Sequence, residues 1–409
     1  MIYLDNAATS CPKPAEVVAA VSEALSDVCA NPSRGAYELS LQASRSVLRT
    51  RQAVAALFNI KDSSRVVFTL NATHALNVAI KGLLAGGPGT RSGPRRSGAG
   101  ETHVVTSSLE HNAVARPLAA LAAAGVEVTR VPCSSDGVTD PDDVLAAVRP
   151  DTALVVLNHA SNVLGTVLPV AEIGPRLRER GVPLLVDAAQ TAGSFPIDVE
   201  AMGIGLLALS GHKGLLGPQG VGALYISPDL LLGTLVEGGT GSRSESLEQP
   251  TTCPERFEAG TLNSPGIAGL GAGIGVVAGE GVTARGTRER ALARRLRARL
   301  AGVEGLHLYG PADQWTPTAP IVSLAIEGLG SGQVAHILDK QFGIAARAGL
   351  HCAPEAHRVA GTLETGLVRL SIGHATTEAE VDAAAEALVN IASKPATYWL
   401  KEWEMQHAR

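Results

Sequence analysis

Short apolar segments alternate with helical patterns through the first two-thirds of this chain. The apolar segments are rich in valine and leucine, and we predict strands at 65–70, 102–108, 126–132, 153–161, 182–189, 206–211 and 222–227. Helical periodicity between them predicts helices at 73–85, 113–125 and 170–181. Nearly continuous apolar strands separated by helices are typical of a mostly parallel sheet that is covered on both faces.

The pattern changes in the last third of the chain. The segment "ARGTRERALARRLRARL" predicts a charged amphipathic helix at 284–300. A strand at 318–328 and helices at 332–343 and 377–393 should follow it. We therefore expect a second, smaller α/β domain.

Composition narrows the class of protein. The 409 residues are 45% hydrophobic and 18% charged, with a net charge of −5, which excludes disorder and argues against nucleic acid as a partner. The start "MIYLDNAATS" does not resemble a signal peptide, and we expect no membrane span. Five cysteines without CxxC spacing favour neither a disulfide framework nor a metal site, and they fit a reducing cytoplasm. The stretch 85–101, rich in Gly, Pro, Ser and Arg, is expected to be a mobile surface loop.

Polar residues follow several of the predicted strands, where ligands bind to open parallel sheets. They are Thr73, His111, Asn162, Asp187, Gln190, His212 and Lys213. Lys213 lies in the glycine-flanked turn "SGHKG", where a flat ligand can approach and the amine can form a Schiff base. An acid such as Asp187, which ends a strand, can keep a pyridine nitrogen protonated. The pair indicates pyridoxal 5'-phosphate (PLP).

Seven motifs then occur in the order of one known family. They are "NPSRGAYELS", "SSLEHNA", "HASNVLGT", "VDAAQ", "SGHKGLLGPQGVG", "RFEAGTLN" and "RAGLHCAP". With "YLDNAATS" before them, the chain resembles a class V aminotransferase-fold enzyme of the cysteine desulfurase and selenocysteine lyase family, in its group II (SufS-like) branch. The resemblance implies the PLP-dependent transferase fold type I, with a seven-stranded sheet in a large domain (16–264). A small domain (1–15 and 265–395) and a tail (396–409) complete the expected chain.

The resemblance also implies individual roles. Lys213 resembles the Schiff-base lysine, Asp187 its partner for the pyridine nitrogen, and His111 the imidazole that stacks on the ring and relays protons. Gln190 and Asn162 resemble residues near the phenolic oxygen, and Asn162 is also a candidate contact for the substrate carboxylate. Phosphate contacts are expected from Thr73, Ser210 and His212, with Asn71 as a further contributor. Thr261 resembles a residue that reaches the cofactor of the neighbouring subunit, which implies a homodimer. Substrate contacts are expected from Arg369, Arg347 and Arg34.

Cys352 is the candidate nucleophile. A thiolate needs partial exposure and positive surroundings, for which Arg347, His351, His357 and Arg358 are candidates. The implied reaction converts L-cysteine to L-alanine and leaves a persulfide on Cys352 for an acceptor protein. Several alternatives remain at this stage. Cys352 could be a small thiol packed beside Pro354. The enzyme could be a selenocysteine lyase acting on L-selenocysteine, a cysteine or cystine C–S lyase, or an epimerase. It could also be a weakly catalytic scaffold for sulfur transfer.

Overall fold

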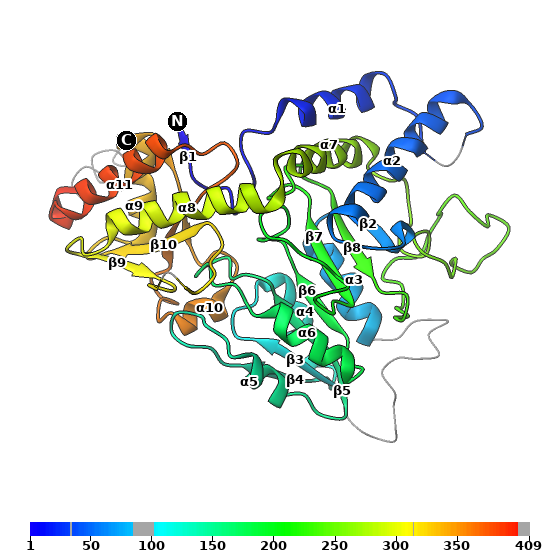
Figure 1. Cartoon of the computed structure of the whole chain (residues 1–409), viewed down its shortest axis with the longest axis horizontal. Coiled ribbons are helices and arrows are strands. Elements are labelled where there is room, and N and C mark those ends of the chain that lie inside the picture. The colour runs from blue at the N-terminus through cyan, green and yellow to red at the C-terminus, as the bar shows by residue number, and fades with distance from the viewer. Residues whose placement is uncertain (33–34, 85–101, 314, 400–409) are drawn as a thin grey trace.

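The computed structural model describes residues 1–32, 35–84, 102–313 and 315–399. The expected loop at 85–101 and the candidate residue Arg34 lie outside these ranges. Two sheets organise the described chain, a large one built from its first two-thirds and a small one built from its last third (Figure 1). The predicted division into 16–264 and 1–15 plus 265–395 stays a prediction.

The large sheet contains the seven strands that the sequence predicts. In spatial order they are β2 (Val66–Thr69), β8 (Gly222–Ile226), β7 (Leu206–Ser210), β6 (Leu184–Asp187), β5 (Thr152–Asn158), β3 (His103–Ser107) and β4 (Glu127–Val131). In this sheet β8 alone runs opposite to the other six strands. The six strands other than the edge strand β4 are buried along their whole length, which explains their continuous apolar sequences.

Helices cover both faces of this sheet. Along β5, Val155 and Leu157 face one hydrophobic core, whereas Leu154 and Val156 face the other, because successive side chains point to opposite faces. The first core is closed by α2 (Glu38–Leu57), α5 (Pro141–Ala146), α6 (Val170–Glu179) and α7 (Ser264–Glu280). The second is closed by α3 (Ala72–Leu84) and α4 (Asn112–Ala122). The predicted helices at 73–85, 113–125 and 170–181 are confirmed as α3, α4 and α6.

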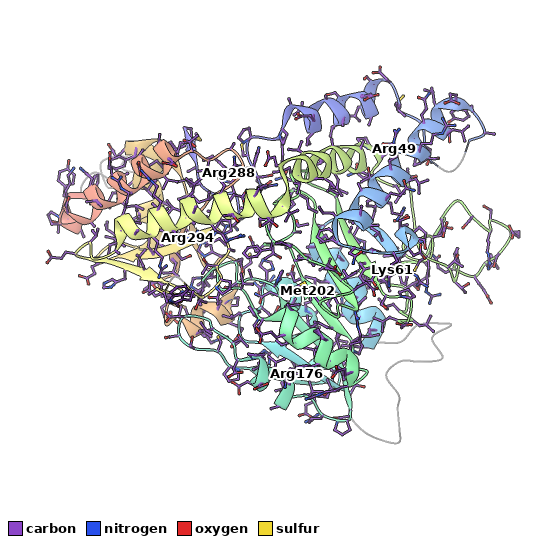
Figure 2. The ribbon with its side chains drawn as sticks, in the orientation of Figure 1. Arg49, Lys61, Arg176, Met202, Arg288 and Arg294 are labelled. Atoms are coloured by element: carbon purple, nitrogen blue, oxygen red, sulfur yellow. The ribbon has the colours of Figure 1, made fainter. Side chains whose placement is uncertain are left out.

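Two further helices, α1 (Ala15–Ser26) and α8 (Val282–Leu300), lie in the upper half of the view in Figure 1. α1 and α2 pack along α7, and α8 continues from α7 after a bend of 82° at Gly281. The sequence pattern predicted α8 but not α7, because the repeated glycines of α7 do not predict a helix. Arg288 and Arg294 project from the exposed face of α8 (Figure 2).

The small sheet has the order β12 (Arg347–Gly349), β13 (Leu367–Ser371), β10 (Ile321–Ile326), β9 (Leu306–Tyr309), and all its neighbours are antiparallel. α8, α9 (Ser331–Phe342) and α11 (Glu378–Ala392) share its hydrophobic core, which also contains Leu4 and Trp399. β10, α9 and α11 confirm the predicted elements. The remaining elements are β1 (Ile2–Tyr3), which pairs with β11 (Ile344–Ala345), the short helix α10 (Pro354–Val359) and the 3-10 turn η1 (Ser63–Arg65).

Within the described residues, no single helix is long and apolar enough to cross a membrane. Only α7 and α8 taken together pass a test of length and composition, and the 82° bend separates them.

Candidate active site

Side chains from five segments meet in one pocket at the carboxyl edge of the large sheet. The predicted residues that line it are Thr73, His111, Asn162, Asp187, Gln190, Ser210, His212 and Lys213. They come together because β5, β6 and β7 are parallel neighbours whose carboxyl ends share one edge. Their individual roles stay predictions.

Lys213 and Asp187 form the charged centre of the pocket. Asp187 is buried and accepts a hydrogen bond from the Ala189 N–H at 2.9 Å. Burial raises the pKa of Asp187, whereas the nearby Lys213 opposes that shift. Burial likewise lowers the pKa of Lys213 to about 8, and the Asp187 carboxylate opposes this fall. An amine with such a pKa is partly neutral near neutral pH and can act as a nucleophile.

His111 lies at the N-terminus of α4 as its capping residue. Its Nδ1 accepts a hydrogen bond from the Ala113 N–H at 3.0 Å, which assigns the proton of the neutral ring to Nε2. Burial, followed by the positive charges of Lys213 and three arginines, lowers the pKa of His111 to about 4. The imidazole is therefore neutral at physiological pH and presents an N–H donor from Nε2.

The residues expected to hold a phosphate line the same pocket. Thr73 is in the first turn of α3, where unpaired backbone N–H groups favour an anion. Nδ1 of His212 is buried and has no hydrogen-bond partner among the described residues. The Asn71 Oδ1 accepts from the His74 N–H at 2.9 Å and so caps α3, and Asn71 also lines the pocket. Its contribution to phosphate binding stays a prediction. PLP fits this pocket as a cofactor, because Lys213 can form a Schiff base, Asp187 is a buried acid, and Nδ1 of His212 has no hydrogen-bond partner among the described residues.

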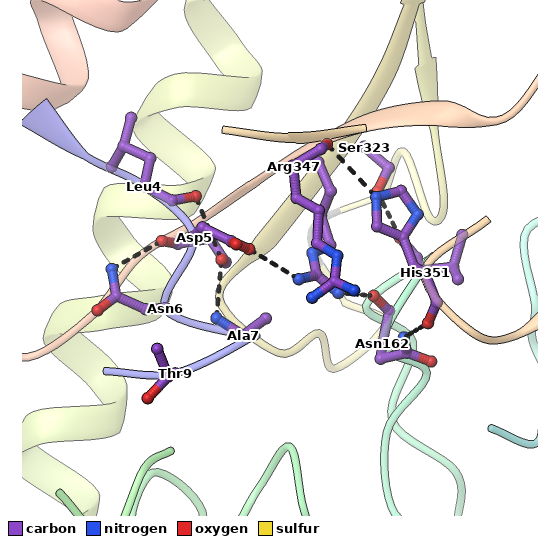
Figure 3. Close-up of polar contacts among 12 residues, drawn as sticks. Leu4, Asp5, Asn6, Ala7, Thr9, Asn162, Ser323, Arg347 and His351 are labelled. Atoms are coloured by element: carbon purple, nitrogen blue, oxygen red, sulfur yellow. Dashed lines mark hydrogen bonds and ion pairs between the residues drawn. The ribbon is translucent and has the colours of Figure 1, made fainter. Parts of the chain in front are cut away.

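The turn that carries Cys352 is fixed to this pocket at two points. The Asn112 N–H donates to the Cys352 carbonyl at 2.7 Å. The Asn162 Nδ2 donates to the His351 carbonyl at 2.7 Å (Figure 3). His351 and Cys352 have φ values of 51° and 57°, a left-handed conformation that non-glycine residues rarely adopt. Cys352 is exposed, so it does not fill space beside Pro354.

The positive surroundings of Cys352 differ from those expected. His351 is buried and stacks on His357 with ring centroids 5.7 Å apart, and burial lowers the pKa of His351 to about 3. Burial lowers the pKa of His357 as well, so neither imidazole supplies positive charge. Arg358 is paired with Glu355. The histidine part of the prediction was therefore wrong, and the remaining candidates are the arginines on the small sheet.

Two of these arginines lie opposite each other on neighbouring strands. Arg347 of β12 and Arg369 of β13 are register partners, so their side chains stand on the same face of the sheet. Arg369 is 2% exposed, and it donates from Nη2 to Asp5 Oδ1 at 2.9 Å and from Nη1 to the Asn162 carbonyl at 3.0 Å. Its Nε is buried without a partner in the described chain.

Other predicted residues are placed less directly. Gln190 lines the pocket and donates from Nε2 to the Ala7 carbonyl at 3.2 Å. Thr261 is exposed and does not line the pocket of its own chain. Arg34 lies outside the described residues.

Sequence reasoning missed the contribution of the N-terminal segment. Asp5 pairs with Arg369, and the His212 carbonyl accepts from four donors, namely Ser10 N, Thr9 Oγ1, Ser10 Oγ and Lys13 Nζ, at 2.9–3.2 Å. It also missed Glu110, a buried carboxyl group beside Asp187. Only Asp5 carried a signal, since it stands within the motif "YLDNAATS".

Comparison with known proteins agrees with this geometry. The family model of aminotransferase class-V matches residues 2–384. The chain therefore belongs to the class-V aminotransferase family, which depends on PLP, and its fold is the predicted fold type I.

Within this family, the chain is similar to proteins named cysteine desulfurase. A probable cysteine desulfurase of Methanothermobacter thermautotrophicus is 37% identical over 396 residues, 96% of this chain and 94% of the relative. A cysteine desulfurase of Klebsiella pneumoniae is 34% identical over 359 residues, 86% of this chain and 84% of the relative. The apo structure of a cysteine desulfurase from Thermococcus onnurineus superposes with a TM-score of 0.87 at 32% identity, covering 96% of this chain and 94% of that one.

Proposed function

We propose that this enzyme is a PLP-dependent cysteine desulfurase. In this proposal it converts L-cysteine to L-alanine and retains the sulfur as a persulfide on Cys352. The observation that carries the proposal is the Cys352 turn, which is exposed and is hydrogen-bonded to two residues around the pocket, Asn112 and Asn162. The cysteine desulfurase names of the relatives support the same activity.

The cofactor would be held by the pocket residues already described. Lys213 would form the Schiff base, Asp187 and Gln190 would contact the ring, His111 would stack on it, and Thr73, Ser210 and His212 would bind the phosphate. When bound, PLP supplies an electron sink for the carbon atoms of the substrate.

The remaining groups would act on the substrate. Arg369 binds its α-carboxylate, because a planar guanidinium suits bidentate recognition. Lys213, with a pKa of about 8, moves the α-proton. The Cys352 thiolate attacks the substrate sulfur, the Cβ–S bond breaks, and its electron pair stays on carbon. Cβ then takes a proton, for which the neutral His111 has an N–H at Nε2.

One experiment separates this activity from its rivals. Purified holoenzyme is given L-cysteine, L-selenocysteine and L-cystine in parallel, and alanine is quantified against pyruvate. Desulfuration yields alanine with one sulfur atom per turnover, whereas C–S lyase activity yields pyruvate and ammonia. Cys352→Ser should abolish alanine formation from L-cysteine while the bound-cofactor absorbance is kept. Full turnover in Cys352→Ser would refute the nucleophile, and racemised amino acid would indicate an epimerase.

We also propose that the enzyme is a homodimer whose active sites are shared. α1 is exposed along most of its length and presents Val18 and Leu25, which are 56% and 62% exposed. Thr261 is exposed outside the pocket of its own chain, as a residue serving a neighbouring subunit would be. The proposal includes an acceptor protein that takes the sulfur from the persulfide. It also includes a reducing cytoplasm as the location, because the five cysteines are free thiols.

A further inference from the structure

Arg369 already holds a carboxylate before any substrate arrives. Asp5, in the segment after β1, accepts from Arg369 Nη2 at 2.9 Å, and the side chains of Arg369 and Asp5 are 2% and 22% exposed (Figure 3). The backbone places Asp5 there independently of this ion pair. Asp5 forms a parallel bridge with Ser371, and the Ser371 N–H donates to the Leu4 carbonyl at 2.7 Å.

Arg369 nevertheless keeps donors for a ligand. A guanidinium has five N–H groups, and the structure assigns one to Asp5 and one to the Asn162 carbonyl. One N–H remains on each Nη, together with the buried and unpaired Nε–H. Asp5 and the Asn162 carbonyl therefore fix the plane of the guanidinium while they leave N–H donors unused for a second carboxylate.

The charges around Arg369 give Asp5 a second effect. The cross-strand partner Arg347 adds a positive charge on the same face, whereas the imidazoles of His111 and His351 are neutral. Asp5 offsets the charge of Arg369, and Arg347 remains as the neighbouring cation on this face of the sheet. The Asp5 carboxylate also repels each carboxylate of a ligand held by Arg369, so a ligand with a second acidic group meets more repulsion than one with a single acidic group.

We propose that Asp5 is a positioning residue that determines substrate specificity. By pairing with Arg369 it matches the site to amino acids with an uncharged or thiol side chain and disfavours amino acids with a second acidic group. This inference rests on the proposed role of Arg369 as the carboxylate anchor.

The test compares two ligands that differ only in charge, L-asparagine and L-aspartate. Their dissociation constants are measured on holoenzyme from the change in bound-cofactor absorbance and checked as inhibition of L-cysteine turnover. L-Aspartate carries one more carboxylate than L-asparagine, so removing the charge of Asp5 relieves more repulsion for L-aspartate. Asp5→Asn should therefore shift the affinity ratio toward L-aspartate by about tenfold or more. If Asp5→Asn also disturbed the position of Arg369, both ligands would bind more weakly by a similar factor. That loss would cancel in their affinity ratio.

Two further variants make the outcome decisive. Glu355→Gln removes an acid that pairs with Arg358 on α10, and it should leave the ratio unchanged. Arg369→Lys should weaken both ligands. If it weakens neither, the proposed carboxylate anchor fails. Suppose that Arg369→Lys weakens the binding of both ligands. The role of Asp5 alone is then overturned if Asp5→Asn leaves the affinity ratio unchanged, or if Glu355→Gln changes that ratio as much as Asp5→Asn does. Asp5→Ser gives the same readout should the asparagine variant fail to accumulate.

Discussion

At the scale of single residues, burial decides which groups of the site carry charge. Burial lowers the pKa of His111 and His212 to about 4 and that of His351 to about 3, so all three imidazoles are neutral at physiological pH. Positive charge near the substrate therefore comes from Arg347 and Arg369, and Lys213 titrates within the working range.

The pKa of Lys213 predicts how fast apoenzyme takes up its cofactor. Only the neutral amine attacks an aldehyde, so the loading rate should rise with pH and level off above about 8. In Asp187→Asn, the group that raises the pKa of Lys213 is lost, and the midpoint should move to lower pH. Stopped-flow absorbance after addition of PLP, from pH 6 to 9 (about the working range of the amine), measures both rates. Lys213→Ala is the control and should show no loading band. A midpoint unchanged in Asp187→Asn would contradict the assignment.

Glu110 predicts a pH-dependent change in stability. Burial raises its pKa from 4.5 to about 8, although Ser107 and Asn158 donate to its Oε1. The folded protein therefore binds a proton more tightly than the unfolded chain, and this contribution is complete below 4.5 and lost as pH rises through about 8. Glu110→Gln keeps an acceptor oxygen and cannot ionise. Its melting temperature should exceed that of the wild type at pH 9 by a few degrees, on the order expected for one buried charge.

The comparison at acidic pH provides the internal control for Glu110. At pH 4 to 5, about the pKa of a carboxyl group in the unfolded chain, both proteins carry an uncharged side chain at this position and their melting temperatures should agree closely. Glu327→Gln, an exposed carboxylate beside His307, should show no such pH-dependent difference. A constant offset between Glu110→Gln and wild type at all pH values would show that packing, not ionisation, is responsible.

At the scale of elements, close backbone packing explains why the glycine-rich segment forms α7. A Cβ on Gly273 would overlap the Leu215 carbonyl oxygen, just after the Lys213 turn, and one on Gly269 would overlap Val21 of α1. These glycines let α7 lie against the turn that holds the site, although glycine is a poor helix former.

Two substitutions in α7 should act in opposite directions. Gly273→Ala forces its Cβ against backbone and should cost on the order of 2 kcal/mol of unfolding free energy. Gly275→Ala meets nothing within 4 Å. It should stabilise the protein by up to about 1 kcal/mol, because alanine favours helix. Urea denaturation followed by circular dichroism measures both. Equal effects of the two substitutions would mean that the close approach to Leu215 does not matter.

At the scale of the whole molecule, the N-terminal segment links the pocket to the small sheet. Lys213 and Asp187 line the pocket at the carboxyl edge of the large sheet, and Arg369 of the small sheet donates to the carbonyl of the pocket residue Asn162. The segment after β1 touches both parts, because Asp5 pairs with Arg369 and Ala7 accepts from Gln190.

The proposed shared sites predict complementation between inactive subunits. Lys213→Ala lacks the Schiff-base lysine, and Thr261→Ala lacks the group proposed to serve the neighbouring site. Co-expressed and separated by different tags, the mixed dimer should have one intact site and about half of the wild-type activity. Each variant alone sets the background. A mixed dimer no more active than the two parents would refute shared sites, and a monomer in sedimentation would refute the dimer.

The sequence by itself determined the seven strands of the large sheet, six of the helices and the strand-end residues of the pocket. Apolar periodicity reports burial directly, and the carboxyl ends of parallel strands share one edge, so Asp187 and Lys213 could be grouped without coordinates. It did not yield α7, because glycine signals a turn unless the packing partner is known.

Only the tertiary structure decided the charge and the partners of the site. The neutrality of His351 and the pairing of Asp5 with Arg369, 364 positions apart in the chain, depend on burial and on long-range contacts that no local pattern encodes. The left-handed turn at Cys352 likewise has no glycine to announce it and is held by hydrogen bonds from Asn112 and Asn162. Local sequence fixes what a segment can form, whereas solvent exclusion and distant partners fix what its side chains can do.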